Sequence, residues 1–295
     1  ITLYGDQKKY RDPIVFQTET KYQKIVLTKW QENYSLFING NLQLSSFDEY
    51  MYHEPLVHPV INLVENRKKV LILGGGDGCA VREILKYEDV EEITLVDLDP
   101  KMTVLGKEHT AFLGMNANAL NNQKVSIKID DAFQFLEHNN LLFDVIIIDL
   151  PDPNNVDLNK LYTKEFYFLC HKRLAKNGAL ITQAGSPYYA SKAYYCIDKS
   201  MQAAGFSTLQ LHNQILTMGE WGWIIGSNNL TTKEIKEKVT STNYDDLNLK
   251  WLNNNAGKGI TYFGKPLVDT TNTSINTLFN PVLYTYYKAG NWKIN

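Results

Sequence analysis

Short stretches in which apolar and polar residues alternate occupy the first part of the chain. In "YQKIVLTKW" and "YSLFINGNLQL", within residues 10–44, apolar side chains recur at every second position, which is typical of strands with one buried face. Asn39-Gly40 predicts a tight hairpin turn between two of these strands. We therefore expect a small antiparallel β-sheet domain over residues 1–60.

The period of the pattern changes near residue 60, where Val60–Glu65 resembles the end of a helix. A buried strand, "KKVLILGGGDG", then enters a glycine turn, and an amphipathic stretch follows. The unit repeats with strands at "EEITLVDLDP", Val125–Ile129, Asp144–Asp149 and Ala179–Gln183, and with helices at Phe133–Asn139, Lys164–Ala175 and Lys192–Ala204. This alternation predicts an α/β domain over residues 61–295, with a parallel sheet covered on both faces. A further strand is expected at "EWGWIIGSN", and the tail from Asn229 has no predicted structure.

Composition places the chain among ordinary globular proteins. Apolar residues make up 44% of the 295 residues and charged residues 21%, which excludes a disordered, collagen-like or disulfide-stapled class. The formal charge of −2 gives no overall attraction to nucleic acid or anionic lipid, and no local basic patch is evident. The three cysteines are too few and too scattered for a secreted framework, so we expect a reducing, cytoplasmic setting.

No stretch of the sequence is long and apolar enough to predict a membrane-spanning helix. Aliphatic runs such as Val145–Ile148 are far shorter than the roughly 20 residues that a spanning helix needs. The chain begins with Ile1 rather than Met, and no signal peptide is visible. We therefore expect a soluble piece of a longer chain.

Gly74-Gly75-Gly76-Asp77-Gly78 lies between a predicted strand and a predicted helix. Glycines at this point let the backbone approach a ligand closely, and the next helix offers free N–H groups, so a nucleotide or nucleoside site is predicted. Asp97 ends the next strand about 20 residues later, where an acidic residue typically binds ribose hydroxyls. An ordinary strand-to-helix turn is the alternative.

The composition of this loop argues against a dinucleotide. Cys79 and Val81 stand where the G-x-G-x-x-G pattern requires its third glycine. Asp77 would also repel a pyrophosphate. A cationic or neutral nucleoside such as S-adenosylmethionine, which carries a sulfonium and no phosphate, suits the loop better.

Two further acidic pairs follow strands of the predicted sheet. Asp130-Asp131 ends the third strand, where Asp131 is favoured to accept a hydrogen bond from an adenine amino group; the alternative is a cap on the helix near Phe133. Asp149 and Asp152 follow the fourth strand, and two carboxylates at the mouth of a cleft suit a substrate with protonated amines. One of them can then act as the base that deprotonates a nucleophilic amine. The alternative is that one aspartate caps a helix or a turn and the other is exposed to solvent.

Two other segments resemble known catalytic motifs but do not match their patterns. His53-Glu54 and His58 resemble the zinc motif H-E-x-x-H, but the second His is one residue too far along and Pro55 is expected to interrupt the turn, so no metal site is predicted. The segment 185–187 lacks the G-x-S-x-G pattern of a serine hydrolase.

Taken together, the motifs resemble the polyamine aminopropyltransferases, of which spermidine synthase is the familiar member. The resemblance covers most of the chain, and its blocks occur in order. They are Tyr22-Gln23, Tyr52-His53-Glu54, Gly74–Gly78, Asp97, "DDAFQFL" from Asp130, "DLPDP" from Asp149, "LYTKEFY" from Leu161, "QAGSP" from Gln183 and "GEWGW" from Gly219.

The resemblance implies a Rossmann-like sheet of the S-adenosylmethionine methyltransferase type and transfer of an aminopropyl group from decarboxylated S-adenosylmethionine to an amine, with no tightly bound cofactor. It makes Asp149 the base, with Tyr52 positioning the amine, and Asp152 the partner of an acceptor ammonium. The donor-binding residues that it implies are Gln23, His53 and Asp77 for the aminopropyl end, Asp97 for the ribose, Asp131 for the adenine, and Gly74 and Gly76 in the loop.

Four residues, at three places in the chain, depart from the pattern of the familiar members. Leu150-Pro151 replaces small hydroxyl residues, Asp97 replaces the more common Glu, and Cys79 stands where Gly is frequent. The "DLPDP" form and the tail "NTLFNPVLYTYY" are more similar to a bacterial subgroup in which this domain follows a membrane-spanning N-terminal part.

We expect an aminopropyltransferase whose most favoured acceptor is putrescine, giving spermidine, with longer polyamines next. The resemblance also implies a homodimer built through the N-terminal sheet. Two alternatives stay open at this point. One is a methyltransferase that uses intact S-adenosylmethionine on a small amine, and the other is a non-catalytic module that binds a polyamine or a nucleoside.

Overall fold

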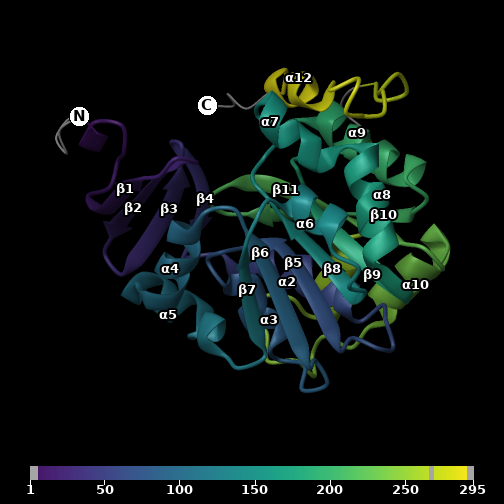
Figure 1. Ribbon diagram of the computed structural model, residues 1–295, viewed down its shortest axis with the longest axis horizontal. Helices are drawn as coiled ribbons and strands as arrows, with labels where there is room; N and C mark the ends of the chain where they lie inside the picture. Colours follow the sequence, from purple (N-terminus) through teal and green to yellow (C-terminus); the bar gives the residue numbers. More distant parts are fainter. Residues whose placement is uncertain (1–5, 266–268, 291–295) are drawn as a thin grey trace.

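The computed structural model describes residues 6–265 and 269–290, so Ile1 lies outside the described residues. A four-stranded antiparallel sheet in the order β1-β2-β3-β4 lies on one side of a seven-stranded sheet in the order β10-β11-β9-β8-β5-β6-β7 (Figure 1). The strands of the small sheet are β1 (Ile14–Glu19), β2 (Lys24–Trp30), β3 (Asn33–Ile38) and β4 (Asn41–Ser45). Those of the large sheet are β5 (Lys69–Gly74), β6 (Glu92–Asp97), β7 (Val125–Ile129), β8 (Phe143–Asp149), β9 (Leu174–Gly185), β10 (Ser207–Ile215) and β11 (Gly219–Ser227).

The predicted hairpin turn is confirmed. Asn39 and Gly40 both have positive φ, of 52° and 84°, and join β3 to β4 directly, with Ile38 paired to Asn41. Two consecutive residues of positive φ match the right-handed twist of the flanking strands, which is why Asn-Gly is favoured there.

The large sheet is mixed, which corrects the expectation of a fully parallel sheet. Strands β5 to β9 run parallel, but β11 pairs antiparallel with both β9 and β10. A tight connection between β10 and β11 is sufficient for an antiparallel pair, whereas a parallel pair would need a crossover helix. Strand β11 was predicted from the sequence, whereas β10 was not.

Both faces of the large sheet are buried, which explains its uninterrupted apolar strands. Val70 and Ile72 of β5 face one apolar cluster, whereas Leu71 and Leu73 face another. Helices of the first face include α2 (Tyr50–Ile61), α3 (Cys79–Ile84) and α10 (Thr232–Ser241); those of the second include α6 (Ala132–His138), α8 (Lys164–Arg173), α9 (Ser191–Ala203) and α12 (Leu283–Lys288). The remaining helices are α4 (Pro100–Glu108), α5 (Thr110–Asn116), α7 (Val156–Asn159) and α11 (Asn254–Gly259), with single 3₁₀ turns η1 (Ala119–Asn121) and η2 (Lys160–Tyr162).

Helix α2 passes through Pro55, which corrects the expectation that this proline interrupts the turn. A proline lacks the N–H that would bond to the carbonyl four residues earlier. That carbonyl belongs to Met51, and it accepts a hydrogen bond of 2.8 Å from the side-chain amide of Asn213 in β10. The helix therefore continues because a neighbouring strand supplies the missing donor.

Glu54 of α2 fixes part of the tail to the main sheet. Its buried carboxylate accepts hydrogen bonds from the backbone N–H groups of Lys250, Trp251 and Leu252 at 2.7–2.9 Å. This explains a buried acid beside His53 without any metal.

The small sheet packs on helices of the α/β domain. Ile25, Leu27 and Leu36 share an apolar cluster with Met102 of α4 and Phe112 of α5. The loop before β2 is thereby held over the edge of the large sheet. The predicted domain division at residue 60 stays a prediction, and α2, which precedes it, packs on the large sheet.

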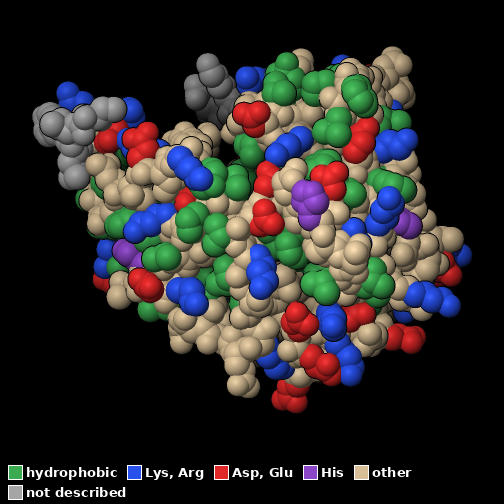
Figure 2. All heavy atoms as spheres, viewed as in Figure 1, with side chains coloured by type: hydrophobic (Ala, Val, Ile, Leu, Met, Phe, Trp, Pro, Cys, Tyr) green, Lys and Arg blue, Asp and Glu red, His purple; other side chains and the backbone are tan. Residues whose placement is uncertain are grey.

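On the face shown in Figure 2, basic and acidic side chains are interspersed and form no basic patch. Among the described residues, no helix is both long and apolar enough to cross a membrane. The membrane-spanning N-terminal part stays a prediction.

Candidate active site

A cleft of about 440 Å³ opens at the carboxyl ends of the parallel strands and is closed on one side by the small sheet. Ligands of open α/β sheets bind at this edge. All the predicted site residues line the cleft, although they come from both sheets and from α2: Gln23, Tyr52, His53, Gly74, Gly76, Asp77, Asp97, Asp131, Asp149 and Asp152.

The glycine loop brings β5 close to β8. Gly74, Gly75 and Gly78 have positive φ, and a Cβ on Gly74 would lie 2.1 Å from the carbonyl oxygen of Asp149. Only glycine permits that conformation and that approach. The loop therefore places its backbone next to Asp149.

Asp97 is organised by backbone donors. Its Oδ2 accepts from Gly76 N at 3.1 Å and its Oδ1 from Asp99 N at 2.9 Å. Burial nevertheless raises the pKa of Asp97 to about 6, with Asp99 and Asp77 adding to the effect. A hydroxyl donor from a ligand would compensate for this burial.

Asp99 also lines the cleft, although no role was predicted for it from the sequence. Its Oδ2 accepts hydrogen bonds from Gln23 Nε2 at 3.0 Å and Thr20 Oγ1 at 2.8 Å, and its Oδ1 accepts from Lys101 N. The signal was present, because Asp before Pro100 is typical of a helix start. Asp99 thus fixes Gln23 in the cleft.

His53 carries a positive charge in this arrangement. Its Nδ1 lies 2.9 Å from the Glu49 carboxylate, one helical turn earlier, and its Nε2 lies 3.9 Å from Asp77 Oδ1. Burial opposes the charge, but Glu49 outweighs it and raises the pKa of His53 to about 9. Arg82 holds Glu49 from the other side, with a nitrogen–oxygen distance of 2.7 Å.

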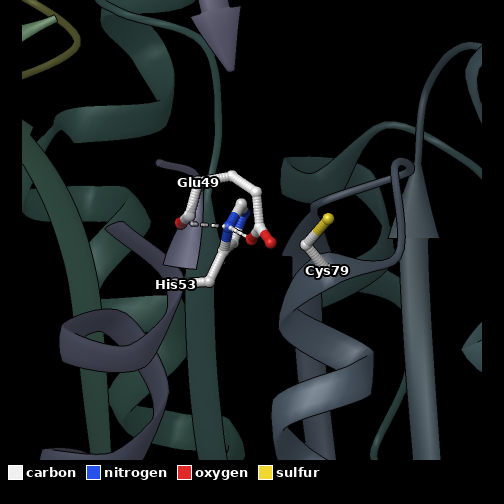
Figure 3. Close-up of side chains that lie close together, drawn as sticks. All are labelled: Glu49, His53 and Cys79. Atoms are coloured by element: carbon white, nitrogen blue, oxygen red, sulfur yellow. Dashed lines mark hydrogen bonds and ion pairs between the residues drawn. The ribbon is translucent and has the colours of Figure 1, made fainter. Parts of the chain in front are cut away.

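Glu49, His53 and Cys79 each offer a metal-ligand atom within 4.8 Å of one another (Figure 3). The figure shows Glu49 bonded to His53, with Cys79 on a neighbouring element beside them. Glu49 is already shared by His53 and Arg82, and burial raises the pKa of Cys79 well above its usual value, so its thiol stays protonated. Ion pairing thus accounts for this cluster.

Asp149 is held by Tyr52. The phenol donates to Asp149 Oδ1 at 2.7 Å, and its ring packs edge-on against Trp223, with centroids 5.3 Å apart. Burial raises the pKa of Asp149 to about 6, while His53 and the Tyr52 hydrogen bond oppose the rise. Burial also raises the pKa of Tyr52 well above its usual value, so the phenol stays a donor.

The Asp152 carboxylate accepts hydrogen bonds from two side chains for which no role was predicted. Gln183 Nε2 donates to Oδ1 at 3.2 Å, and Tyr287 Oη donates to Oδ2 at 2.7 Å. Burial raises the pKa of Asp152 to about 6, and both hydrogen bonds oppose the rise. Gln183 stands at the start of the "QAGSP" block, and Tyr287 is the last residue of the tail segment "NTLFNPVLYTYY", in which no single residue had a predicted role.

Asp131 caps a helix, as the alternative interpretation expected. Its Oδ1 accepts from Phe133 N and Gln134 N, while its Oδ2 accepts from Lys160 Nζ at 2.7 Å. These partners outweigh burial and lower the pKa of Asp131. The capping contacts use one oxygen only, so a role of Oδ2 toward a ligand stays a prediction.

The site as a whole presents carboxylates to one cavity. Asp77, Asp97, Asp149 and Asp152 all line it, and the protonated His53 lies next to Asp77. Buried carboxylates without full charge compensation favour a cationic ligand.

Comparisons with known proteins agree with this chemistry. Residues 49–238 match the family described as "Spermine/spermidine synthase domain". A polyamine aminopropyltransferase of Oceanobacillus iheyensis is 42% identical over 286 residues, which are 96% of this chain and 54% of that protein. One of Leptospira interrogans is 41% identical over 288 residues, which are 97% of this chain and 56% of that protein. The chain thus spans about half the length of these curated relatives.

Solved structures show the same fold. A spermidine synthase in complex with the transition state analogue AdoDATO superposes with a TM-score of 0.75 at 25% identity, over 85% of each chain. Spermidine synthase from Thermotoga maritima gives a TM-score of 0.73 at 24% identity, over 85% of this chain and 84% of that one, and this likeness concerns the fold alone.

Proposed function

This chain belongs to the spermine/spermidine synthase family, and on that premise we propose that it moves the aminopropyl group of decarboxylated S-adenosylmethionine to a polyamine, with putrescine as the favoured acceptor. The observation that carries the proposal is the convergence of Asp149, held by Tyr52, with Asp152 and the glycine loop on one cleft. The loop suits the nucleoside, and the two aspartates suit a diamine.

The reaction is an in-line displacement at carbon. The lone pair of the acceptor amine forms a C–N bond to the first carbon of the aminopropyl chain, while the C–S bond breaks and its electron pair neutralises the sulfonium. The products are methylthioadenosine and the extended amine. The attacking amine loses one proton, which Asp149 accepts and passes to solvent. Alignment and exclusion of water supply most of the acceleration.

Asp149 and Asp152 interact with opposite ends of the acceptor in this proposal. Asp152 binds the distal ammonium, and Asp149 takes the proton of the attacking nitrogen. The raised pKa of Asp149, about 6, makes it a stronger base than an ordinary carboxylate while it stays ionised at neutral pH. Tyr52 fixes the orientation of that carboxylate through its hydrogen bond to Oδ1.

The donor occupies the other half of the cleft in this proposal. Asp77, Gln23 and His53 bind its aminopropyl end, Asp97 binds the ribose hydroxyls and Asp131 the adenine amino group. Asp77 favours a donor whose carboxylate has been removed, because intact S-adenosylmethionine would place like charges together.

Two features of the whole protein belong to the same proposal. The chain forms a homodimer through the small sheet, whose Val15 and Trp30 leave 49% and 60% of their surface exposed. It works in a reducing, cytoplasmic setting, which suits the buried free thiols of Cys79, Cys170 and Cys196.

Product analysis tests the proposed activity. The protein is incubated with putrescine and either decarboxylated or intact S-adenosylmethionine, and products are separated by chromatography. Methylthioadenosine and spermidine from the decarboxylated donor alone support the proposal. Methylated amine with S-adenosylhomocysteine indicates a methyltransferase instead, and tight binding in calorimetry without turnover indicates a binding module.

A further inference from the structure

The C-terminal segment of the chain reaches the acceptor end of the cleft. Helix α12 lies beside α7 and α9 (Figure 1), and its Leu283 is fully buried in the core on that face of the large sheet. Tyr287, one helical turn later, donates its 2.7 Å hydrogen bond to Asp152 Oδ2. A residue more than a hundred positions away therefore contacts the aspartate that follows β8.

Asn276 fixes this arrangement. It is fully buried, and its side-chain amide donates to the carbonyl oxygens of Asn159 and Tyr162 at 3.2 and 3.1 Å. Its Oδ1 accepts from Leu283 N at 3.3 Å, and Tyr284 N donates to Asn159 Oδ1 at 3.1 Å. The start of α12 is thus tied to the segment just after Asp152, which places Tyr287 reproducibly.

Tyr287 stands behind Asp152 as seen from the cleft. Asp152 lines the cleft, whereas Tyr287 is not among the lining residues. The Tyr287 ring lies 3.7 Å from the position that a Cβ on Gly185 would occupy, so it packs on the backbone at the end of β9. Space beyond the Asp152 carboxylate is therefore filled by an aromatic ring.

We propose that Tyr287 determines acceptor length: it closes the cleft behind Asp152 and holds the Asp152 carboxylate toward the bound amine. The inference rests on the proposed function, in which Asp152 binds the distal ammonium. A diamine ends at Asp152 and leaves Tyr287 in place. A triamine must extend past Asp152, and it meets the Tyr287 ring.

The hydroxyl and the ring of Tyr287 have separable roles. The titratable side chains facing Asp152 are Tyr52 of α2, Tyr162 of η2 and Tyr287 of α12, and the first two also approach Asp149. The Tyr287 hydrogen bond lowers the pKa of Asp152. Loss of the hydroxyl therefore raises that pKa, so the carboxylate is protonated at a higher pH, whereas loss of the ring opens the cleft.

Two variants separate these effects, with Tyr286→Phe on the same helix as the matched control. Methylthioadenosine release is measured with decarboxylated S-adenosylmethionine and putrescine, cadaverine or spermidine across pH 5–9. For Tyr287→Phe, KM for putrescine rises about tenfold, as expected for loss of a hydrogen bond to a charged group. Its kcat and donor KM stay within twofold, and the acid limb of kcat/KM moves to higher pH. For Tyr287→Ala, the ratio of kcat/KM for spermidine to that for putrescine rises at least tenfold.

The outcomes distinguish this inference from the proposed function. If the wild type is active but Tyr287→Phe matches Tyr286→Phe in KM and pH profile, the positioning role is wrong. If Tyr287→Ala keeps the wild-type acceptor ratio, the length-limiting role is wrong. Should that variant fail to fold, Tyr287→Leu replaces it: a cadaverine-to-putrescine ratio of kcat/KM above that of the wild type supports the length-limiting role, and an unchanged ratio contradicts it. If the wild type releases no methylthioadenosine with any acceptor, the proposed function fails and this inference fails with it.

Discussion

The phenol of Tyr52 donates a 2.7 Å hydrogen bond to Oδ1 of Asp149, across 97 residues of sequence. Among residues 6–265 and 269–290, no donor bonds to the other carboxylate oxygen, which lies over the glycine loop. One oxygen is thus fixed by the protein, and the other is available to a ligand in the cleft. This division of the two oxygens is the geometry that a general base requires.

Loss of the Tyr52 hydroxyl is expected to move the pH profile. The hydrogen bond favours the Asp149 carboxylate, so Tyr52→Phe raises the pKa of Asp149 above about 6 and shifts the acid limb of kcat to higher pH. We expect kcat at pH 8 to fall about tenfold, since a hydrogen bond to a charged group is lost. Steady-state rates from pH 5 to 9 check this, and an unmoved acid limb would contradict it.

Asp149→Asn is expected to stabilise the protein. Burial raises the folded-state pKa of Asp149 to about 6 from 3.8, so above pH 6 the native state holds a charge that the unfolded state holds more easily. The variant gains up to about 3 kcal/mol in free energy of unfolding at pH 8. The gain shrinks as pH falls from 6 and vanishes below about 3.8, where both states are protonated. Urea denaturation at pH 8 and pH 4 measures it, and a variant less stable than wild type at pH 8 would refute the burial argument.

Much of the fold was predictable because its signals are local. Strand–turn–helix units, the Asn39-Gly40 hairpin and the glycine loop follow from periodicity and backbone freedom within a few residues. The passage of α2 through Pro55 was not predictable, because its missing donor comes from Asn213 on a distant strand. Strand β10 and the helices of the tail likewise depend on tertiary packing.

The same contrast holds for the site. The predicted residues all line the cleft, and each of them stands at the carboxyl end of a strand or in a block of the family pattern. Asp99 and Glu49 carried local signals that were overlooked, an N-cap before Pro100 and an i,i+4 partner for His53. Tyr287 ends the tail segment "NTLFNPVLYTYY", but nothing in that segment indicated a contact with Asp152, since only the fold of the tail brings the two residues together.

Donor binding is expected to release a proton from His53. The pKa of His53 is raised to about 9, so the ring is protonated at pH 8, and an arriving ammonium and sulfonium disfavour that charge. Binding of decarboxylated S-adenosylmethionine is measured by calorimetric titration in Tris and in phosphate. The two binding enthalpies should differ by the difference between the ionisation enthalpies of the buffers, multiplied by up to about one released proton. Glu49→Gln removes the partner that raises the pKa, so the buffer dependence should largely disappear. Equal enthalpies for the wild type in both buffers would show that His53 keeps its proton.

Asp131→Asn separates capping from adenine binding. Asn is as good an N-cap as Asp, so stability should change by less than about 0.5 kcal/mol. The oxygen now paired with Lys160 becomes an amide nitrogen, which cannot accept from an adenine amino group. The variant should bind methylthioadenosine about tenfold more weakly than the wild type does. Its affinity for methylthioinosine, which lacks that amino group, should change little. Equal losses for both nucleosides would leave Asp131 as a helix cap only.

The most direct test of the account is the rate of one turnover by Asp149→Asn with decarboxylated S-adenosylmethionine and putrescine, measured beside its affinity for methylthioadenosine. As the base, Asp149 should be worth about 10²- to 10⁴-fold in that rate, with nucleoside affinity within threefold of wild type. A variant that keeps most of its rate, or loses rate and nucleoside affinity in equal measure, would contradict the assignment of Asp149 as the base.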